Sequence, residues 1–329
     1  MTETAAASAP ARAAAFLRRY PVVTLLILLA LLTLGLQITS IAMYGKGIVN
    51  QLWFGNRLNY AIALAMLAAC QTITMYTGGI DLSAAVVATI VAFVMATLTP
   101  ALGAGWAILV AMVPAVLVGL LNGFGIGVCR VHPLIMTLGS GLIATGFLLV
   151  YQRTVIATGV EVPAALVWLG TGRTLGLPNA LIVFVPFAAF LIWAQGRWGF
   201  GRLLYAVGAN ENAARLSGVR IWQVHMALYL VASLIAGLTG LIYVGQIRQA
   251  SLSLALPLLL PAVAATVIGG TSIFGGRGSY AGTIVGAMIL AVLVSLLTLL
   301  QIPEGARRIL FGAVILAVTA VYVRLSDQG

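Results

Sequence analysis

The chain has 329 residues, of which 62% are hydrophobic and only 7% charged, and its net charge is +11. A soluble domain carries about 25% charged residues, so this composition excludes a protein whose whole surface faces water. The basic residues gather in short stretches beside long apolar runs, which is typical of the loops of a membrane protein and not of a nucleic-acid-binding surface.

Residues 1–20 predict a cytoplasmic tail. Arg18 and Arg19 stand directly before an uncharged run that is too long for the core of a signal peptide, and no small-residue cleavage pattern follows it. The first apolar run therefore predicts a retained helix.

Apolar stretches of spanning length recur along the rest of the chain. Crossing the hydrocarbon core takes roughly 20 apolar residues, so the sequence predicts about ten transmembrane helices. They are expected at Pro21–Gly45, Leu58–Ile80, Leu82–Ala101, Ala104–Cys129, Leu134–Gln152, Thr174–Gly196, Ile221–Ile247, Gln249–Gly276, Gly278–Pro303 and Ile309–Val323. Their continuous hydrophobicity excludes a β-barrel. We expect an all-α membrane bundle over residues 21–325, a short tail at 326–329 and both termini in the cytoplasm.

Glycines occur in several of these apolar runs, either at regular spacing or as adjacent pairs. Gly119, Gly123 and Gly127 recur every four residues, as do small residues where helices pack closely in lipid, and Gly237 and Gly240 lie three residues apart in another span. The pairs Gly78-Gly79, Gly269-Gly270 and Gly275-Gly276 instead break helices. Unwound backbone at membrane depth is tolerated only beside protein or a watery cavity.

Transporters place substrates at such breaks, although simple turns remain an equal alternative. The candidate translocation or gating residues are Gly78, Gly79, Asp81, Ser83, Asn122, Gly269 and Gly270, with Asp81 expected in a loop. Gln71 and Gln246 are further polar residues within spans, where a bond between helices is the commoner role.

Two connections are long enough to hold structure of their own. Arg153–Arg173 predicts a short interfacial helix around Trp168. Residues 197–220 predict a cytoplasmic helix from Glu211 to Ser217, with Asn210 as N-cap and Gly218 as left-handed C-cap. So short a helix is unstable alone, so it needs either its own membrane domain or a partner protein to lie against.

Catalytic constellations are missing from the sequence. The one lysine, Lys46, lacks the glycine and hydroxyl residues of a phosphate-binding loop. The six acidic residues are never paired, and His132 and His225 stand apart, so we expect no catalytic residues, metal or cofactor. A stand-alone channel or ion-coupled carrier stays open, but only Asp81 approaches the membrane interior.

Three motifs carry a family resemblance. Thr77–Ser83 (TGGIDLS), Gly208–Val219 (GANENAARLSGV) and Val267–Gly276 (VIGGTSIFGG) resemble, in this order, the permease subunits of bacterial ABC sugar importers of the ribose type. Gly119–Gly127 and His132–Ser140 extend the similarity, which runs from about Leu58 to Leu325.

The resemblance implies an inner-membrane permease that imports a small polar solute, with a monosaccharide expected first. It implies three partners: a separate ABC ATP-binding subunit that uses the ATP, a periplasmic solute-binding protein, and a second permease in a homodimer or heterodimer within the lipid. It also implies that the ATPase docks on the capped helix, through Gly208, Asn210, Glu211, Ala213, Arg215, Leu216, Ser217 and Gly218.

The chain departs from the family pattern at two places. Many members carry an acidic pair before the IGG motif, whereas Leu256–Gly270 (LPLLLPAVAATVIGG) has two prolines and no carboxylate. Ala84-Ala85 replaces the Val-Gly that often follows GGIDLS. Either the partner permease of a heterodimer keeps the acids, or the substrate is a less usual one. Related permeases for branched-chain amino acids or nucleosides, which share glycine-rich spans and similar loops, remain the alternative.

Overall fold

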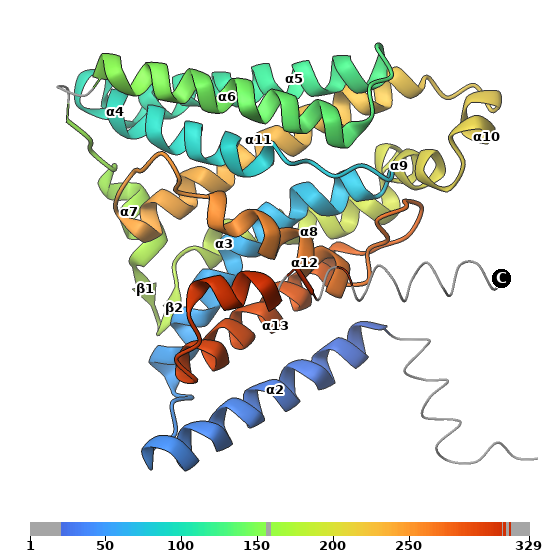
Figure 1. Cartoon of the computed structure of the whole chain (residues 1–329). Helices are drawn as coiled ribbons and strands as arrows, with labels where there is room; N and C mark the ends of the chain where they lie inside the picture. The colour runs from blue at the N-terminus through green and yellow to red at the C-terminus, as the bar shows by residue number, and fades with distance from the viewer. Residues whose placement is uncertain (1–20, 156–158, 311, 314–315, 317–329) are drawn as a thin grey trace, which may run out of the picture.

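The computed structural model describes residues 21–155, 159–310, 312–313 and 316 (Figure 1). Its elements, in chain order, are α2 (Pro21–Tyr44), α3 (Gln51–Met75), α4 (Ala84–Ala111), α5 (Val113–Gly127), α6 (Pro133–Val155), α7 (Ala164–Thr171), β1 (Arg173–Thr174), β2 (Leu177–Pro178), α8 (Leu181–Arg197), α9 (Gly199–Ala209), α10 (Glu211–Leu216), α11 (Ile221–Ile247), the 3-10 turn η1 (Leu256–Leu258), α12 (Leu259–Ile268) and α13 (Tyr280–Leu299). The predicted helical membrane bundle is confirmed. The two tails, 1–20 and 326–329, lie outside the described residues.

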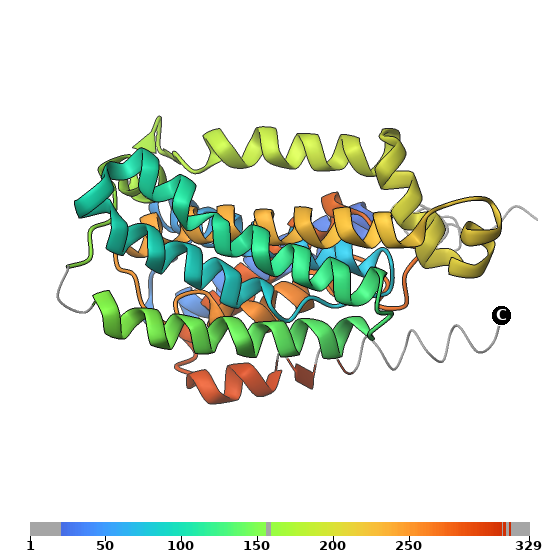
Figure 2. The same cartoon turned by 90° about the horizontal axis from the view of Figure 1, so that it is seen from above.

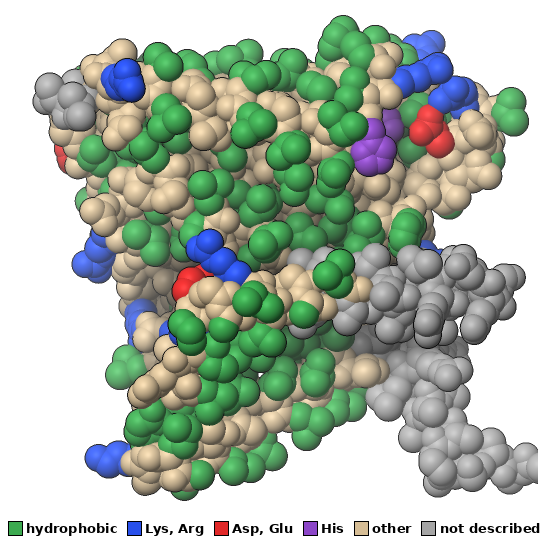
Figure 3. Space-filling model, viewed as in Figure 1, with side chains coloured by type: hydrophobic (Ala, Val, Ile, Leu, Met, Phe, Trp, Pro, Cys, Tyr) green, Lys and Arg blue, Asp and Glu red, His purple; other side chains and the backbone are tan. Residues whose placement is uncertain are grey.

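Helices α3 and α11 form the centre of the bundle. Nearly every residue of α3 from Ala61 to Met75 is buried, and α11 packs against α3, α4, α5 and α7. Helices α6 and α8 lie on either side of α11 (Figure 2) and turn large apolar side chains outward, among them Ile143 and Phe190. Apolar side chains likewise cover the middle of the face in Figure 3, and many of the charged ones lie towards its left and right ends. A bundle with an apolar waist and charged ends suits a bilayer.

The number of spans is only partly settled. Within the described residues six helical stretches are long and apolar enough to cross a membrane, or seven if α8 and α9 count as one bent span, so the predicted ten is not confirmed. One of the six, Ala84–Gly127, contains two predicted spans. Its 44 residues would extend for roughly 66 Å as one straight helix. Gly103 breaks it with φ 74° and ψ 161°, and the chain turns back there (Figure 1).

Two predicted spans differ from what the structure contains. Thr174–Gly196 begins as the β1–β2 hairpin and becomes α8, which ends at Arg197 and bends by 62° into α9. Gln249–Gly276 contains only η1 and the ten-residue α12. The reason is local: Pro257 restricts the start, and the Gly269-Gly270 pair ends the helix. Most of Ile309–Val323 lies outside the described residues.

The four-residue glycine repeat packs α5 against α11. A Cβ on Gly123 would lie 2.7 Å from the Cα of Met226, and one on Gly119 2.9 Å from the Cα of Leu230. Gly127 meets the backbone of Trp222 in the same way. The two helix backbones approach closely along this stripe, as the small-residue spacing predicts.

We expect Gly123→Leu to force α5 away from α11 and to destabilise the fold, because overpacking a tight contact costs about 1–3 kcal/mol or more. Thermal unfolding of the purified chain in detergent measures this as a lower melting temperature. Gly139→Leu on α6 is the control, since a Cβ there meets nothing within 4 Å. An equal decrease in melting temperature in both variants would contradict close packing of α5 against α11.

Candidate functional site: a re-entrant segment and a capped helix meet at glycines

The TGGIDLS motif forms a non-helical segment that returns into the bundle. After α3, Gly78 takes a positive φ of 77°, and the chain then runs inward without helix or strand structure until α4 begins at Ala84 (Figure 1). We call residues 76–83 the re-entrant segment. Asp81 and Ser83 within it are fully buried. Asp81 therefore lies in a loop, as expected, but this loop is in the interior of the bundle.

Side chains from neighbouring helices satisfy the backbone of this segment. Gln71 of α3 donates to the Asp81 carbonyl at 2.6 Å and accepts from the Asp81 N–H at 3.2 Å. Thr137 of α6 accepts from the Leu82 N–H and donates to the Ile80 carbonyl, each at 3.1 Å. These bonds replace the water that unwound backbone at membrane depth lacks.

The candidate gating residues separate into two places. Ser83 donates from its N–H and its hydroxyl to Asp81 Oδ1, at 2.9 and 2.5 Å, and Asn122 donates to the Ser83 hydroxyl at 3.0 Å. Gly79 lies against the hydroxyl of Tyr229, where a Cβ would come within 2.5 Å. Gly269 and Gly270 are not in this cluster, because Gly269 instead packs its backbone against Thr283 of α13.

Unpaired polar atoms remain around Asp81. Asp81 Oδ2, Asn122 Oδ1 and the Tyr229 hydroxyl are buried and have no hydrogen-bond partner among the described residues. The cluster can therefore accept further hydrogen bonds. Groups of three or more His, Cys, Asp or Glu side chains able to hold a metal ion do not occur in the described part of the chain.

The short capped helix predicted within residues 197–220 is present as α10, with both caps. Asn210 accepts from the Ala213 N–H at 2.9 Å. At the other end Gly218 has φ 87°, its N–H donates to the Arg215 carbonyl, and the Val219 N–H donates to the Ala214 carbonyl. These two bonds make a Schellman motif. The helix ends at Leu216, one residue earlier than predicted, with Ser217 as its C-cap.

The surface of α10 is largely exposed. Ala214 is its one buried residue, Leu216 is 90% exposed, and Glu211 pairs with Arg215 at 2.6 Å at the surface. The eleven-residue helix α9, which precedes α10, was not predicted. Its buried Leu204 and Val207 anchor it to the bundle, so that α10 projects from a fixed base.

Close backbone contacts at four glycines bring the three sequence motifs together. Gly208 at the end of α9 lies so near the Tyr76 carbonyl that a Cβ would overlap it. Gly276, from the loop between α12 and α13, donates from its N–H to the same carbonyl at 3.0 Å. A Cβ on Gly275 would lie 3.0 Å from the Gly78 nitrogen. We call Gly78, Gly208, Gly275 and Gly276 the glycine junction.

A polar and aromatic network surrounds the junction, and the sequence analysis missed its members. The rings of Tyr76 and Tyr205 lie 4.4 Å apart, and Tyr205 donates to the Gly278 carbonyl at 2.9 Å. Gln195 of α8 accepts from the Tyr76 hydroxyl and from the Tyr280 N–H at 2.7 and 3.0 Å. Elements α3, α8, α9 and α13 are thereby joined. Single tyrosines and a glutamine inside apolar runs gave no signal of this.

A polar cavity of about 520 Å³ lies between α10, the re-entrant segment and α11. Charged and imidazole groups line it, namely Arg130, His132, Glu211, Arg215 and His225. By contrast, Gln246 serves only to join helices, since it donates to the carbonyl and the side-chain oxygen of Asn59.

We expect Gly208→Ala to lower the melting temperature by several degrees, because the new methyl group overlaps backbone atoms that cannot rotate away. The matched control is Gly199→Ala in the same helix, where a Cβ meets nothing within 4 Å. If the two variants have the same melting temperature, the glycine junction is not a tight contact.

Gln71→Leu should also destabilise the chain, by about 1–3 kcal/mol for each backbone group of Asp81 left without a partner. Chemical unfolding in detergent measures this, with Thr145→Val as control because the Thr145 hydroxyl bonds only within its own helix. An unchanged unfolding midpoint for Gln71→Leu would mean that other groups satisfy the re-entrant segment.

The chain is similar in sequence to known transport proteins over most of its length. Residues 54–319 match the family described as "Branched-chain amino acid transport system / permease component". The ribose import permease protein RbsC of Escherichia coli K12 is 35% identical over 283 residues, which are 83% of this chain and 85% of that protein.

More distant relatives give the same picture. RbsC of Bacillus subtilis 168 is 32% identical over 79% of this chain and 81% of its own length. The autoinducer 2 import system permease protein LsrC of E. coli is 32% identical over 80% of this chain and 76% of its own. No solved structure matches the chain. The chain therefore belongs to this permease family of ABC importers, as a multi-pass transport subunit and not an enzyme.

Proposed function

We propose that this chain forms the inward pathway of an ATP-driven importer for a small polar solute of the monosaccharide class. The curated relatives named above support a sugar-type solute, since their names specify ribose and autoinducer 2. The family description supports the alternative, a branched-chain amino acid. The observation that carries the mechanism is the glycine junction, which joins the exposed helix α10 to the re-entrant segment.

In this proposal a separate ATP-binding subunit docks on α10, and a periplasmic binding protein delivers the solute at the opposite end, near the β1–β2 hairpin. Helix α2 begins at the α10 end of the bundle (Figure 1), which agrees with an N-terminus in the cytoplasm. Two permeases, two copies or two different chains, would enclose the pathway. Nucleic acid has no part in it.

ATP-driven closure of the ATPase subunits would push on α10. Because Gly208 and Gly276 both contact the Tyr76 carbonyl, displacement of α9 and α10 would carry the re-entrant segment with it. Asp81, Ser83 and Asn122 would then shift relative to α6, since Thr137 holds the same segment. We assign these residues, with Gly78 and Gly79, to gating of the pathway.

The acidic pair that many family members carry before the IGG motif is absent from this chain. In this chain the stretch before the IGG motif is η1 and α12, where Pro261 and Ala262 are buried among apolar residues. Either a different partner permease supplies the carboxylates, or the solute does not need them.

Leu216→Asp is expected to abolish copurification of the ATPase subunit while the permease still folds, because the substituted side chain is 90% exposed. Leu175→Asp is the control: it is 95% exposed but lies in the hairpin loop at the other end. Pull-down without the binding protein isolates this contact. Retained ATPase with Leu216→Asp, at wild-type stability, would contradict docking on α10.

The solute class is tested with the full complex in proteoliposomes. A pentose or related sugar, delivered by the binding protein, should stimulate ATP hydrolysis, whereas leucine and a nucleoside should not. Stimulation by leucine would favour the branched-chain amino acid alternative. Uptake by the permease alone, without an ATPase, would instead indicate a channel or an ion-coupled carrier.

A further inference from the structure

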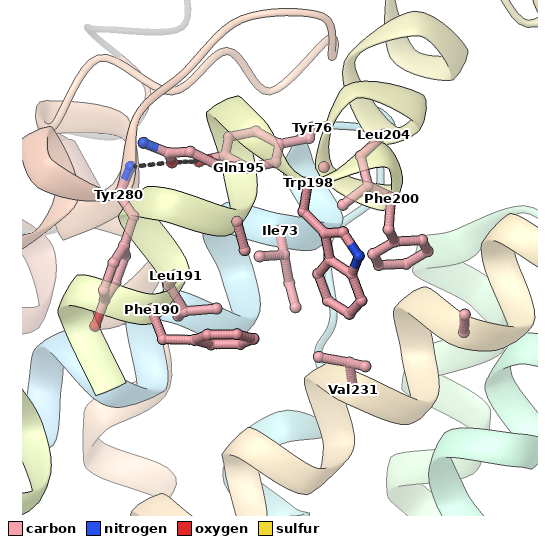
Figure 4. Close-up of a pocket in the computed structure, with 13 residues that line it drawn as sticks. Ile73, Tyr76, Phe190, Leu191, Gln195, Trp198, Phe200, Leu204, Val231 and Tyr280 are labelled. Carbon is pink, nitrogen blue, oxygen red and sulfur yellow. Dashed lines mark hydrogen bonds between the residues drawn. The ribbon is translucent and has the colours of Figure 1, made fainter. Parts of the chain in front are cut away.

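An apolar cavity of about 310 Å³ lies at the elbow between α8 and α9, against α11 (Figure 4). Phe190, Trp198 and Phe200 form its aromatic walls, and Leu204 and Val231 line it further. Gln195 is the polar exception, and its oxygen already accepts from Tyr76 and Tyr280. The interior therefore offers little to a polar ligand and suits a hydrocarbon chain.

The cavity opens to the outer face of α8. Phe190 and Trp198 are 50% and 49% exposed. Because α8 is an apolar helix at the periphery of the bundle, we expect this face to meet lipid.

Basic residues lie at the α10 end of the cavity. A second cavity of about 360 Å³ shares Phe200 and Ala227 with the first and is lined by Arg220 and Gln223. Arg197 lies seven residues after Phe190, two turns along the same face of α8. Among the described residues neither arginine forms a salt bridge. Unpaired arginines beside an apolar groove attract anionic head groups of the cytoplasmic leaflet.

We propose that this groove binds one anionic phospholipid, which belongs to the cytoplasmic leaflet on the basis of the proposed function, where α10 faces the cytoplasm. One acyl chain lies in the elbow between Trp198 and Val231, and the phosphate lies at Arg220 and Arg197. The lipid fills the angle between α8 and α9, and α9 leads directly into α10. The site therefore borders the network around the glycine junction, since Tyr76 and Gln195 also line the cavity, and it supports the base of the exposed helix.

The test uses tryptophan quenching by phospholipids with brominated acyl chains, either phosphatidylglycerol or phosphatidylcholine, in otherwise identical vesicles. Subtracting the Trp198→Phe signal isolates Trp198 from the other tryptophans. We expect Trp198 to be quenched at several-fold lower mole fractions of brominated phosphatidylglycerol than of phosphatidylcholine. Arg197→Gln with Arg220→Gln, both at exposed positions, should remove that preference.

A second readout is the number of phosphatidylglycerol molecules kept through delipidation, counted by native mass spectrometry. Ala227→Phe fills both cavities and should lose one lipid, whereas Ala189→Phe, on an exposed part of α8, should lose none. Equal quenching by the two lipids would overturn the head-group site. No quenching of Trp198, or equal lipid counts in the two phenylalanine variants, would overturn the acyl-chain site.

Discussion

The contact between the Gly208 backbone and the Tyr76 carbonyl is the constraint on which the proposed mechanism depends. A side chain at Gly208 would overlap that carbonyl, and Gly276 bonds to the same oxygen at 3.0 Å. Three segments distant in sequence, at the ends of α3 and α9 and before α13, therefore touch through backbone atoms. Packed backbone transmits displacement better than flexible side chains, because interiors are dense and yield little. The rings of Tyr76 and Tyr205 add a second contact between α3 and α9.

The second requirement is that unwound backbone stay inside a membrane bundle. Gln71 and Thr137 stabilise this unwound backbone by hydrogen-bonding to four backbone groups of the re-entrant segment. The two side chains come from helices on different sides, α3 and α6. Gln71 lies ten residues before Asp81 in the chain, whereas Thr137 belongs to α6, a helix that borders the lipid. A movement that slides the segment along α6 must exchange the Thr137 bonds, which gives the bundle a place where two arrangements can alternate.

Features governed by local sequence were predicted well. The caps of α10 follow from Asn210 and Gly218, the close packing of α5 (though not its partner, α11) from the glycine spacing, and α7 from the apolar stretch around Trp168. Non-local features were not. The burial of Asp81 was not predicted, because hydrophobicity shows where helices stop but not that the segment between them turns inward. Helix α9 was missed because Gly199, Gly201 and Arg202 at its start make the stretch after α8 resemble a connecting loop. Gln195 and Tyr205 resemble any isolated polar residue in a span, since their partners are fixed only by the fold.

The claim that α9 and the loop before α13 move as one body can be measured with a reversible lock. A Cβ at position 276 lies 3.4 Å from the Cβ of Ala209, which is close to the separation that a disulfide needs. Ala209→Cys with Gly276→Cys, made after Cys70 and Cys129 are replaced by serine, should therefore form a disulfide on oxidation. Comparing oxidised and reduced samples of this one variant cancels any strain at position 276. The account predicts ATP-driven uptake at the same rate in both samples. Uptake that stops on oxidation and returns on reduction would contradict it, because the two segments would then have to separate in each transport cycle.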